Sequence, residues 1–91
     1  MSSAPHAVSW TATAQRSLHR LPEKVATACV EFVYGSLADN PRRVGRPLRF
    51  ELTGLHSARR GDFRVIYEID DDHGTVTVVA IDHRSDVYRP R

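Results

Sequence analysis

The chain has 91 residues, enough for one small domain, which we expect to span residues 1–91. No run approaches the roughly 18 apolar residues of a membrane-spanning helix, and the N-terminus lacks the basic and apolar regions of a secretory signal. Cys29 is the single cysteine, which excludes an internal disulfide. We therefore expect a cytoplasmic protein with no membrane partner.

The net charge is only +2, but twelve of the thirteen basic residues are arginine. Between Pro41 and Arg64 there are seven arginines against two acids, Glu51 and Asp62. Because the planar guanidinium binds phosphate through two hydrogen bonds, this stretch predicts an anionic partner, either a nucleic acid or an acidic protein segment. A genome that favours arginine codons would give the same composition.

The predicted elements begin with a β-prone segment at Ala7–Trp10 and a first helix that Thr11 or Thr13 can cap and Pro22 ends.

A second helix follows and stops at Asp39-Asn40-Pro41. Cys29 lies within its apolar stripe, so we interpret it as a buried small side chain and not as a nucleophile. The stripe consists of Val25, Ala28, Cys29, Phe32, Val33 and Leu37.

Residues 42–53 contain Gly45 and Pro47 and are expected to be irregular. Three strands follow, at residues 55–60, 63–69 and 75–82, joined by a Gly61-Asp62 turn and a loop at 70–74. The order β-α-α-β-β-β predicts an α+β domain in which a two-helix hairpin packs on one face of an antiparallel sheet. The other face would stay open and could carry a site.

The Gly61-Asp62 turn predicts a concentration of positive charge. If these two residues form the turn, Arg59 lies directly opposite Arg64, an arrangement that destabilises a sheet unless an anion lies between the guanidinium groups. A different register, or an ion pair to an acid such as Glu68, would remove this requirement.

Three further candidates follow the last strand. His83 can take or give a proton near neutral pH, Arg84 can hold a phosphate, and Tyr88 can stack on a base or donate its hydroxyl. The spacing of the histidines predicts no metal site, and we expect no cofactor. These side chains fit cleavage of RNA without a metal, because the 2′-hydroxyl is a built-in nucleophile.

Several segments then carry a resemblance. The clearest is Ser57–Tyr67 (SARRGDFRVIY), supported by Pro47-Leu48, Leu52-Thr53-Gly54, His83–Tyr88 (HRSDVY) and the upstream helix at 14–22. Together they resemble the RelE/ParE superfamily of toxins from type II toxin–antitoxin modules, over nearly the whole chain.

The RelE branch implies a ribosome-dependent endoribonuclease that cuts the mRNA codon in the A site, leaves a 2′,3′-cyclic phosphate and a 5′-hydroxyl, and inhibits translation. A RelB-like antitoxin would block it. The resemblance and the residue chemistry together give a catalytic set of Arg64, His83, Arg84 and Tyr88. Contacts to mRNA and ribosomal RNA would come from Arg42, Arg43, Arg46, Arg49, His56, Arg59 and Arg60.

The chain departs from the family at the general base. Some RelE toxins carry lysines where this chain has Leu55-His56-Ser57, and the YoeB-like branch has a glutamate where this chain has Arg46. The base is therefore open between His83, the first choice, and His56. Two other functions stay open as well: a ParE-like inhibitor of DNA gyrase without nuclease activity, and a non-catalytic module that binds only antitoxin or RNA. A His/Arg/Tyr set on the open face would favour the nuclease, since gyrase inhibition does not need one.

Overall fold

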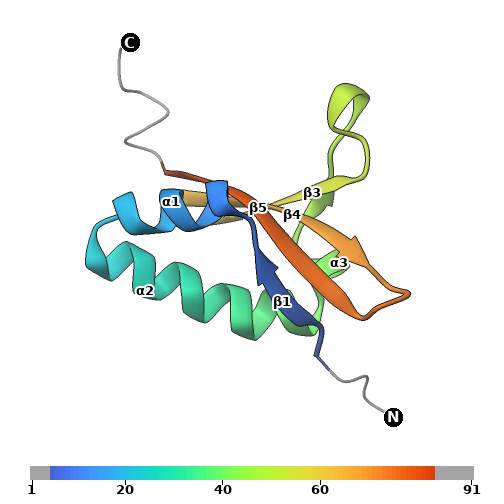
Figure 1. The fold of residues 1–91 in the computed structure, drawn as a ribbon, viewed down its shortest axis with the longest axis horizontal. Helices are drawn as coiled ribbons and strands as arrows, with labels where there is room; N and C mark the ends of the chain where they lie inside the picture. Colours follow the sequence, from blue (N-terminus) through green and yellow to red (C-terminus); the bar gives the residue numbers. More distant parts are fainter. Residues whose placement is uncertain (1–4, 84–91) are drawn as a thin grey trace.

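The computed structural model describes residues 5–83, which form a sheet with two helices packed against one face (Figure 1). The helical elements are α1 (Ala12–Arg20), α2 (Glu23–Phe32), a π-helical turn η1 (Val33–Leu37) that continues α2, the short α3 (Pro41–Val44) and a 3₁₀ turn η2 (Phe50–Leu52). The strands are β1 (Ala7–Trp10), β2 (Arg46–Pro47), β3 (Leu55–Arg60), β4 (Phe63–Asp70) and β5 (Thr75–His83). The predicted α+β class is confirmed. None of the helices in this part of the chain is long and apolar enough to cross a membrane.

The sheet has the strand order β1-β5-β4-β3-β2. Strands β3, β4 and β5 form the predicted antiparallel meander. The sheet as a whole is mixed and not antiparallel throughout, because β1 pairs in parallel with β5. In this register Val8 lies beside Val76 and Trp10 beside Val78, so β1 adds its apolar positions to the face that the helices cover.

The turn between β3 and β4 has the predicted length. Gly61 adopts a φ of 57°, which a side chain disfavours, and the strands on either side pair from Arg60 with Phe63 onward. Arg59 is therefore directly opposite Arg64, which confirms the register derived from the turn.

A β-bulge interrupts the pairing of β4 with β5. Ile66 pairs with Ala80 and Tyr67 with Val78, so Val79 is an extra residue on β5. The Thr11 hydroxyl donates a hydrogen bond to the Val79 carbonyl oxygen at 2.8 Å. An extra residue reverses the side-chain alternation of a strand, so the positions of β5 beyond Val79 exchange faces.

The core lies between this face and the helices. Alternate residues of β4, from Phe63 to Tyr67, are buried against α2 and η1. Phe32 and Phe63 meet edge to face, with their ring centroids 6.3 Å apart. The apolar stripe of the second helix is confirmed at Cys29, Phe32, Val33 and Leu37, whereas Val25 is partly buried and Ala28 is exposed.

The segment expected to be irregular is ordered into α3, β2 and η2. The Tyr67 hydroxyl, buried in the core, donates a hydrogen bond to the Pro41 carbonyl oxygen and so fixes α3 over the sheet. Gly45 follows α3 and lies against both the Tyr67 side chain and the backbone of β3 at Ser57. Composition alone misses this packing, because it depends on a distant tyrosine.

We expect the substitution Gly45→Ala to lower the free energy of unfolding by about 1–3 kcal/mol, as overpacked sites do. The added Cβ would lie 2.2 Å from the Tyr67 hydroxyl oxygen and 2.7 Å from the Ser57 carbonyl oxygen. Gly35→Ala is the matched control, because no atom lies within 4 Å of the Cβ it adds. Urea denaturation should give a lower midpoint for Gly45→Ala than for the control, and equal midpoints would contradict the expected clash.

Candidate functional site

The face of the sheet opposite the helices carries the candidate site. Because Val65 and Tyr67 point into the core, the alternate residues Arg64 and Glu68 point away from it and are exposed. We call this surface the open face. In the observed register it carries Arg46 from β2, Leu55, Ser57 and Arg59 from β3, Arg64, Ile66 and Glu68 from β4, and Ala80 and Asp82 from β5.

One row of the open face concentrates charge. Arg59, Arg64 and Asp82 lie directly opposite one another on β3, β4 and β5. Side chains that face each other in this way have Cβ atoms about 4.5–5.5 Å apart. Within residues 5–83 neither arginine has an ion-pair partner within 4 Å, so the predicted alternative of a bridge to Glu68 does not occur. Among the described residues, no ion pair therefore neutralises the two guanidinium groups.

Arg46 lies in the neighbouring row, where it pairs with Ser57. The open face therefore brings together three of the predicted arginines, Arg46, Arg59 and Arg64, all of them exposed. Arg43 on α3 and Arg49 after β2 are also exposed, but neither belongs to a strand of the open face.

Two predicted contact residues lie on the helix side instead. The guanidinium carbon of Arg60 is 5.5 Å from the centroid of the Phe32 ring, a cation–π contact on α2. The His56 ring stacks on Tyr67, with 5.6 Å between ring centroids. Burial, and then the positive charge of Arg42, lower the pKa of His56. The lowered pKa favours the neutral ring of His56, which lies on the opposite face from Arg64.

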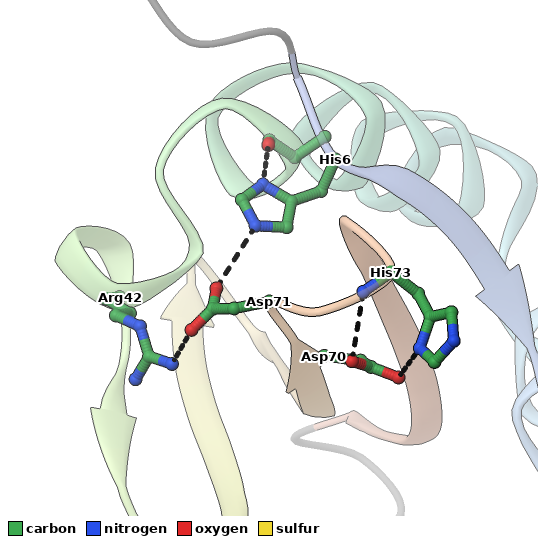
Figure 2. Close-up of polar contacts among 6 residues, drawn as sticks. His6, Arg42, Asp70, Asp71 and His73 are labelled. Carbon is green, nitrogen blue, oxygen red and sulfur yellow. Dashed lines mark hydrogen bonds and ion pairs between the residues drawn. The ribbon is translucent and has the colours of Figure 1, made fainter.

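Arg42 belongs to a separate cluster at the other end of the meander (Figure 2). It forms an ion pair with Asp71 in the β4–β5 loop, and the second carboxylate oxygen of Asp71 is 3.7 Å from the His6 ring. The hydrogen bond from Arg42 is the main reason why the pKa of Asp71 is lowered. In the same loop His73 contacts Asp70 at 2.8 Å and lowers its pKa. The cluster ties the segment before β1 to α3 and the β4–β5 loop, and it occupies Arg42.

The last strand presents a different residue to the open face than the sequence suggested. His83 pairs with Phe63, so its register places it on the helix side, whereas Asp82 lies beside Arg64. The expectation of a His/Arg/Tyr set on the open face is thus not met at His83. The bulge at Val79 is the cause: without it, Ile81 and His83 would occupy the open face. Arg84 and Tyr88 lie outside the described residues.

Asp82 was missed by sequence analysis, because no residue pattern marks the bulge that turns it toward Arg64. Its side chain is exposed and supplies a carboxylate within one strand spacing of the arginine row. The row therefore combines groups that can bind a phosphate with a group that can accept a proton.

Cys29 is excluded as a nucleophile by its surroundings. Its side chain is fully buried in α2, and burial raises the pKa of its thiol from the ordinary 9.0 to about 11. This confirms the interpretation of Cys29 as a buried small side chain.

At pH 8 we expect Cys29 in the folded protein to react with an aromatic disulfide reagent at least about 100-fold more slowly than Cys29 in the unfolded chain. The reason is that its thiol pKa in the fold is about two units above the ordinary value. Absorbance of the released thiolate, followed with and without denaturant, measures both rates. Equal rates would show that the thiol is accessible and ionised.

Comparisons with known proteins agree on one family. Residues 8–88 match the family model described as the ParE toxin of the type II toxin–antitoxin system parDE. The chain is 61% identical over 85 residues to Toxin RelE of Mycobacterium tuberculosis, covering 93% of this chain and 88% of that protein. It is 53% identical over 85 residues to Toxin RelG of the same organism, covering 93% of this chain and 98% of that protein.

A solved structure shares the fold closely. The RelBE2 toxin–antitoxin complex of M. tuberculosis aligns with a TM-score of 0.87 and 52% sequence identity, over 89% of this chain and all of the matched chain.

Proposed function

The chain belongs to the ParE toxin family of type II toxin–antitoxin systems and is a toxin of the RelE type, and we propose that it inhibits translation as a ribosome-dependent endoribonuclease. In this proposal it cuts the mRNA codon in the ribosomal A site. The observation that carries the proposal is the juxtaposition of Arg59 and Arg64, exposed and without an ion-pair partner in residues 5–83, on a sheet face that the helices leave uncovered.

The proposed reaction needs no metal. The 2′-hydroxyl of the mRNA loses its proton as its oxygen attacks the adjacent phosphorus, and the bond from phosphorus to the 5′-oxygen breaks. The leaving 5′-oxygen takes up a proton from water, so the products are a 2′,3′-cyclic phosphate and a 5′-hydroxyl. Arg64 would neutralise the charge that accumulates on the phosphate oxygens in the transition state, with Arg59 as the second cation of the row. Arg84 and Tyr88 would complete the site from the C-terminal segment, by binding phosphate and by stacking on a base.

The proton of the 2′-hydroxyl needs an acceptor, and two residues of β5 are candidates. His83 has the suitable chemistry and ends the strand, but its register places it on the helix side. Asp82 shares the open face with Arg64. The register therefore favours Asp82, and the predicted role of His83 is the alternative.

The remaining exposed arginines fit a general RNA contact. Arg43, Arg46 and Arg49 would bind phosphates of the mRNA and of ribosomal RNA, so affinity for the ribosome should fall steeply with salt. Arg42, Arg60 and His56 also keep this proposed role, although each has a partner inside the protein.

A RelB-like antitoxin is the proposed protein partner. The similar M. tuberculosis toxin was solved in a toxin–antitoxin complex, and a basic open face attracts an acidic segment. A second candidate function is inhibition of DNA gyrase, which the name of the matching family model favours. The arginine row favours the nuclease.

We expect Arg64→Ala to reduce mRNA cleavage about 10²–10³-fold, the usual cost of losing one donor to a transition-state oxyanion. The measurement is primer extension on an mRNA in a cell-free translation reaction, read as new 5′ ends inside the reading frame. Arg20→Ala, an exposed arginine of α1, is the matched control and should cleave normally.

Omitting ribosomes should abolish the new 5′ ends for the unmodified protein. Intact mRNA in the presence of ribosomes and active protein would overturn the nuclease proposal. Inhibition of DNA supercoiling by gyrase would then establish the second candidate. Full cleavage by a folded Arg64→Ala variant would remove Arg64 from the mechanism.

The variants Asp82→Asn and His83→Gln show which of the two candidate residues accepts the proton. Each change keeps the size of the side chain while weakening or removing its ability to accept a proton. If Asp82 is the acceptor, Asp82→Asn should slow single-turnover cleavage about 10²–10⁴-fold while ribosome binding stays within twofold. His83→Gln should then have a small effect. The opposite order of effects would assign the role to His83.

A further inference from the structure

The loop between β2 and β3 exposes an aromatic ring that packing does not explain. Phe50 is 90% exposed, against 55% for Tyr34 and 51% for Leu52, the other large exposed hydrophobic side chains in residues 5–83. In Figure 1 this loop, drawn yellow-green, extends away from the sheet and from both long helices. Leu52 lies in the same turn, and an exposed aromatic ring at a projecting tip contributes little to the core.

The backbone that carries the ring is nevertheless held in a defined conformation. The Phe50 carbonyl oxygen accepts a hydrogen bond from the Thr53 backbone at 3.1 Å and another from the Thr53 hydroxyl at 2.7 Å. The backbone N–H of Leu48 closes the base of the loop by donating to the Leu55 carbonyl oxygen at 2.8 Å. Phe50 has a φ of 61°, a left-handed conformation that a bulky side chain rarely adopts. The turn therefore maintains an unfavourable backbone conformation while presenting the ring to solvent.

The surroundings of the ring indicate what it contacts. Arg49 precedes it and Glu51 follows it, and the wider stretch from Pro41 to Arg64 holds seven arginines against two acids. A projecting tip with one aromatic ring is a poor binding site for a helical protein segment, because such a segment needs an extended apolar groove. A flat apolar ring beside positive charge matches an unpaired base and its phosphates in single-stranded RNA.

The Phe50 loop lies away from the proposed cleavage site, so a contact made by Phe50 is separate from the contact with the substrate phosphate. Arg59 and Arg64 lie at the Gly61-Asp62 end of β3, and the Phe50 loop leaves from the opposite end, at Leu55. Four residues of strand separate the two, which is about 13 Å at the usual rise.

We propose that Phe50 stacks on an unpaired base of ribosomal RNA and so anchors the toxin on the ribosome away from the scissile phosphate. The proposal rests on the proposed ribosome-dependent function. Arg49 supplies an accompanying phosphate contact.

The test measures binding of the full chain to purified ribosomes that carry no mRNA. We expect Phe50→Ala to weaken binding about tenfold, the effect of losing one base–aromatic stack. Phe50→Trp should restore the affinity, whereas Phe50→Leu should not. Tyr34→Ala, which removes an exposed ring from η1, is the matched control and should bind normally.

The salt dependence distinguishes stacking from charge. Phe50→Ala should lower the affinity without changing the slope of log affinity against log salt concentration, because no cation is lost. Arg49→Ala should reduce that slope by about one phosphate contact. Urea denaturation should give equal midpoints for Phe50→Ala and the unmodified protein, since the ring is not packed.

Three outcomes would overturn the proposal. If the unmodified protein binds and cleaves on ribosomes and Phe50→Ala binds equally well, the anchor fails while the proposed function stands. If the unmodified protein does not bind ribosomes, both fail. If Phe50→Ala keeps its ribosome affinity but loses affinity for the antitoxin, the loop is a protein-docking site.

Discussion

The hydroxyl of Thr11 joins two features on which the arrangement of the sheet depends. Its oxygen accepts the Ala14 N–H and so caps α1, and the same hydroxyl donates to the carbonyl oxygen of Val79 at the bulge of β5. The helix therefore starts where the bulged strand offers an acceptor. Since the bulge sets which residues of β5 face the helices, one side chain couples the position of the helical layer to the composition of the open face.

This coupling explains where sequence reasoning succeeded and where it failed. The turn at Gly61-Asp62 has a fixed length, so it predicted the register of β3 on β4 and the position of Arg59 opposite Arg64. The bulge at Val79 has no residue signature, and it exchanged His83 for Asp82 beside Arg64. The parallel pairing of β1 was also missed, because a short β-prone segment carries no information on its neighbour.

The connection at residues 41–54 was missed for a related reason. Its order comes from tertiary contacts, chiefly the Tyr67 hydroxyl on the Pro41 carbonyl oxygen and the close approach of Gly45 to β3. The arginines that the sequence grouped as one basic stretch are consequently divided among four environments. Arg46, Arg59 and Arg64 are on the open face, Arg60 covers Phe32, Arg42 is paired with Asp71, and Arg43 and Arg49 are exposed outside the open face. Local charge density thus identified a basic stretch, but it did not indicate which of its arginines are available.

The brevity of β2 also leaves part of one sheet edge without a paired strand. Within residues 5–83, β2 pairs only with Ser57 and His56, so the last part of β3, which carries Arg59 and Arg60, remains at the edge of the sheet. Exposed strand edges promote association between copies of a protein, and charged side chains oppose it. Arg59 and Arg60 therefore place two positive charges along the unpaired edge, where they oppose edge-to-edge pairing with another copy.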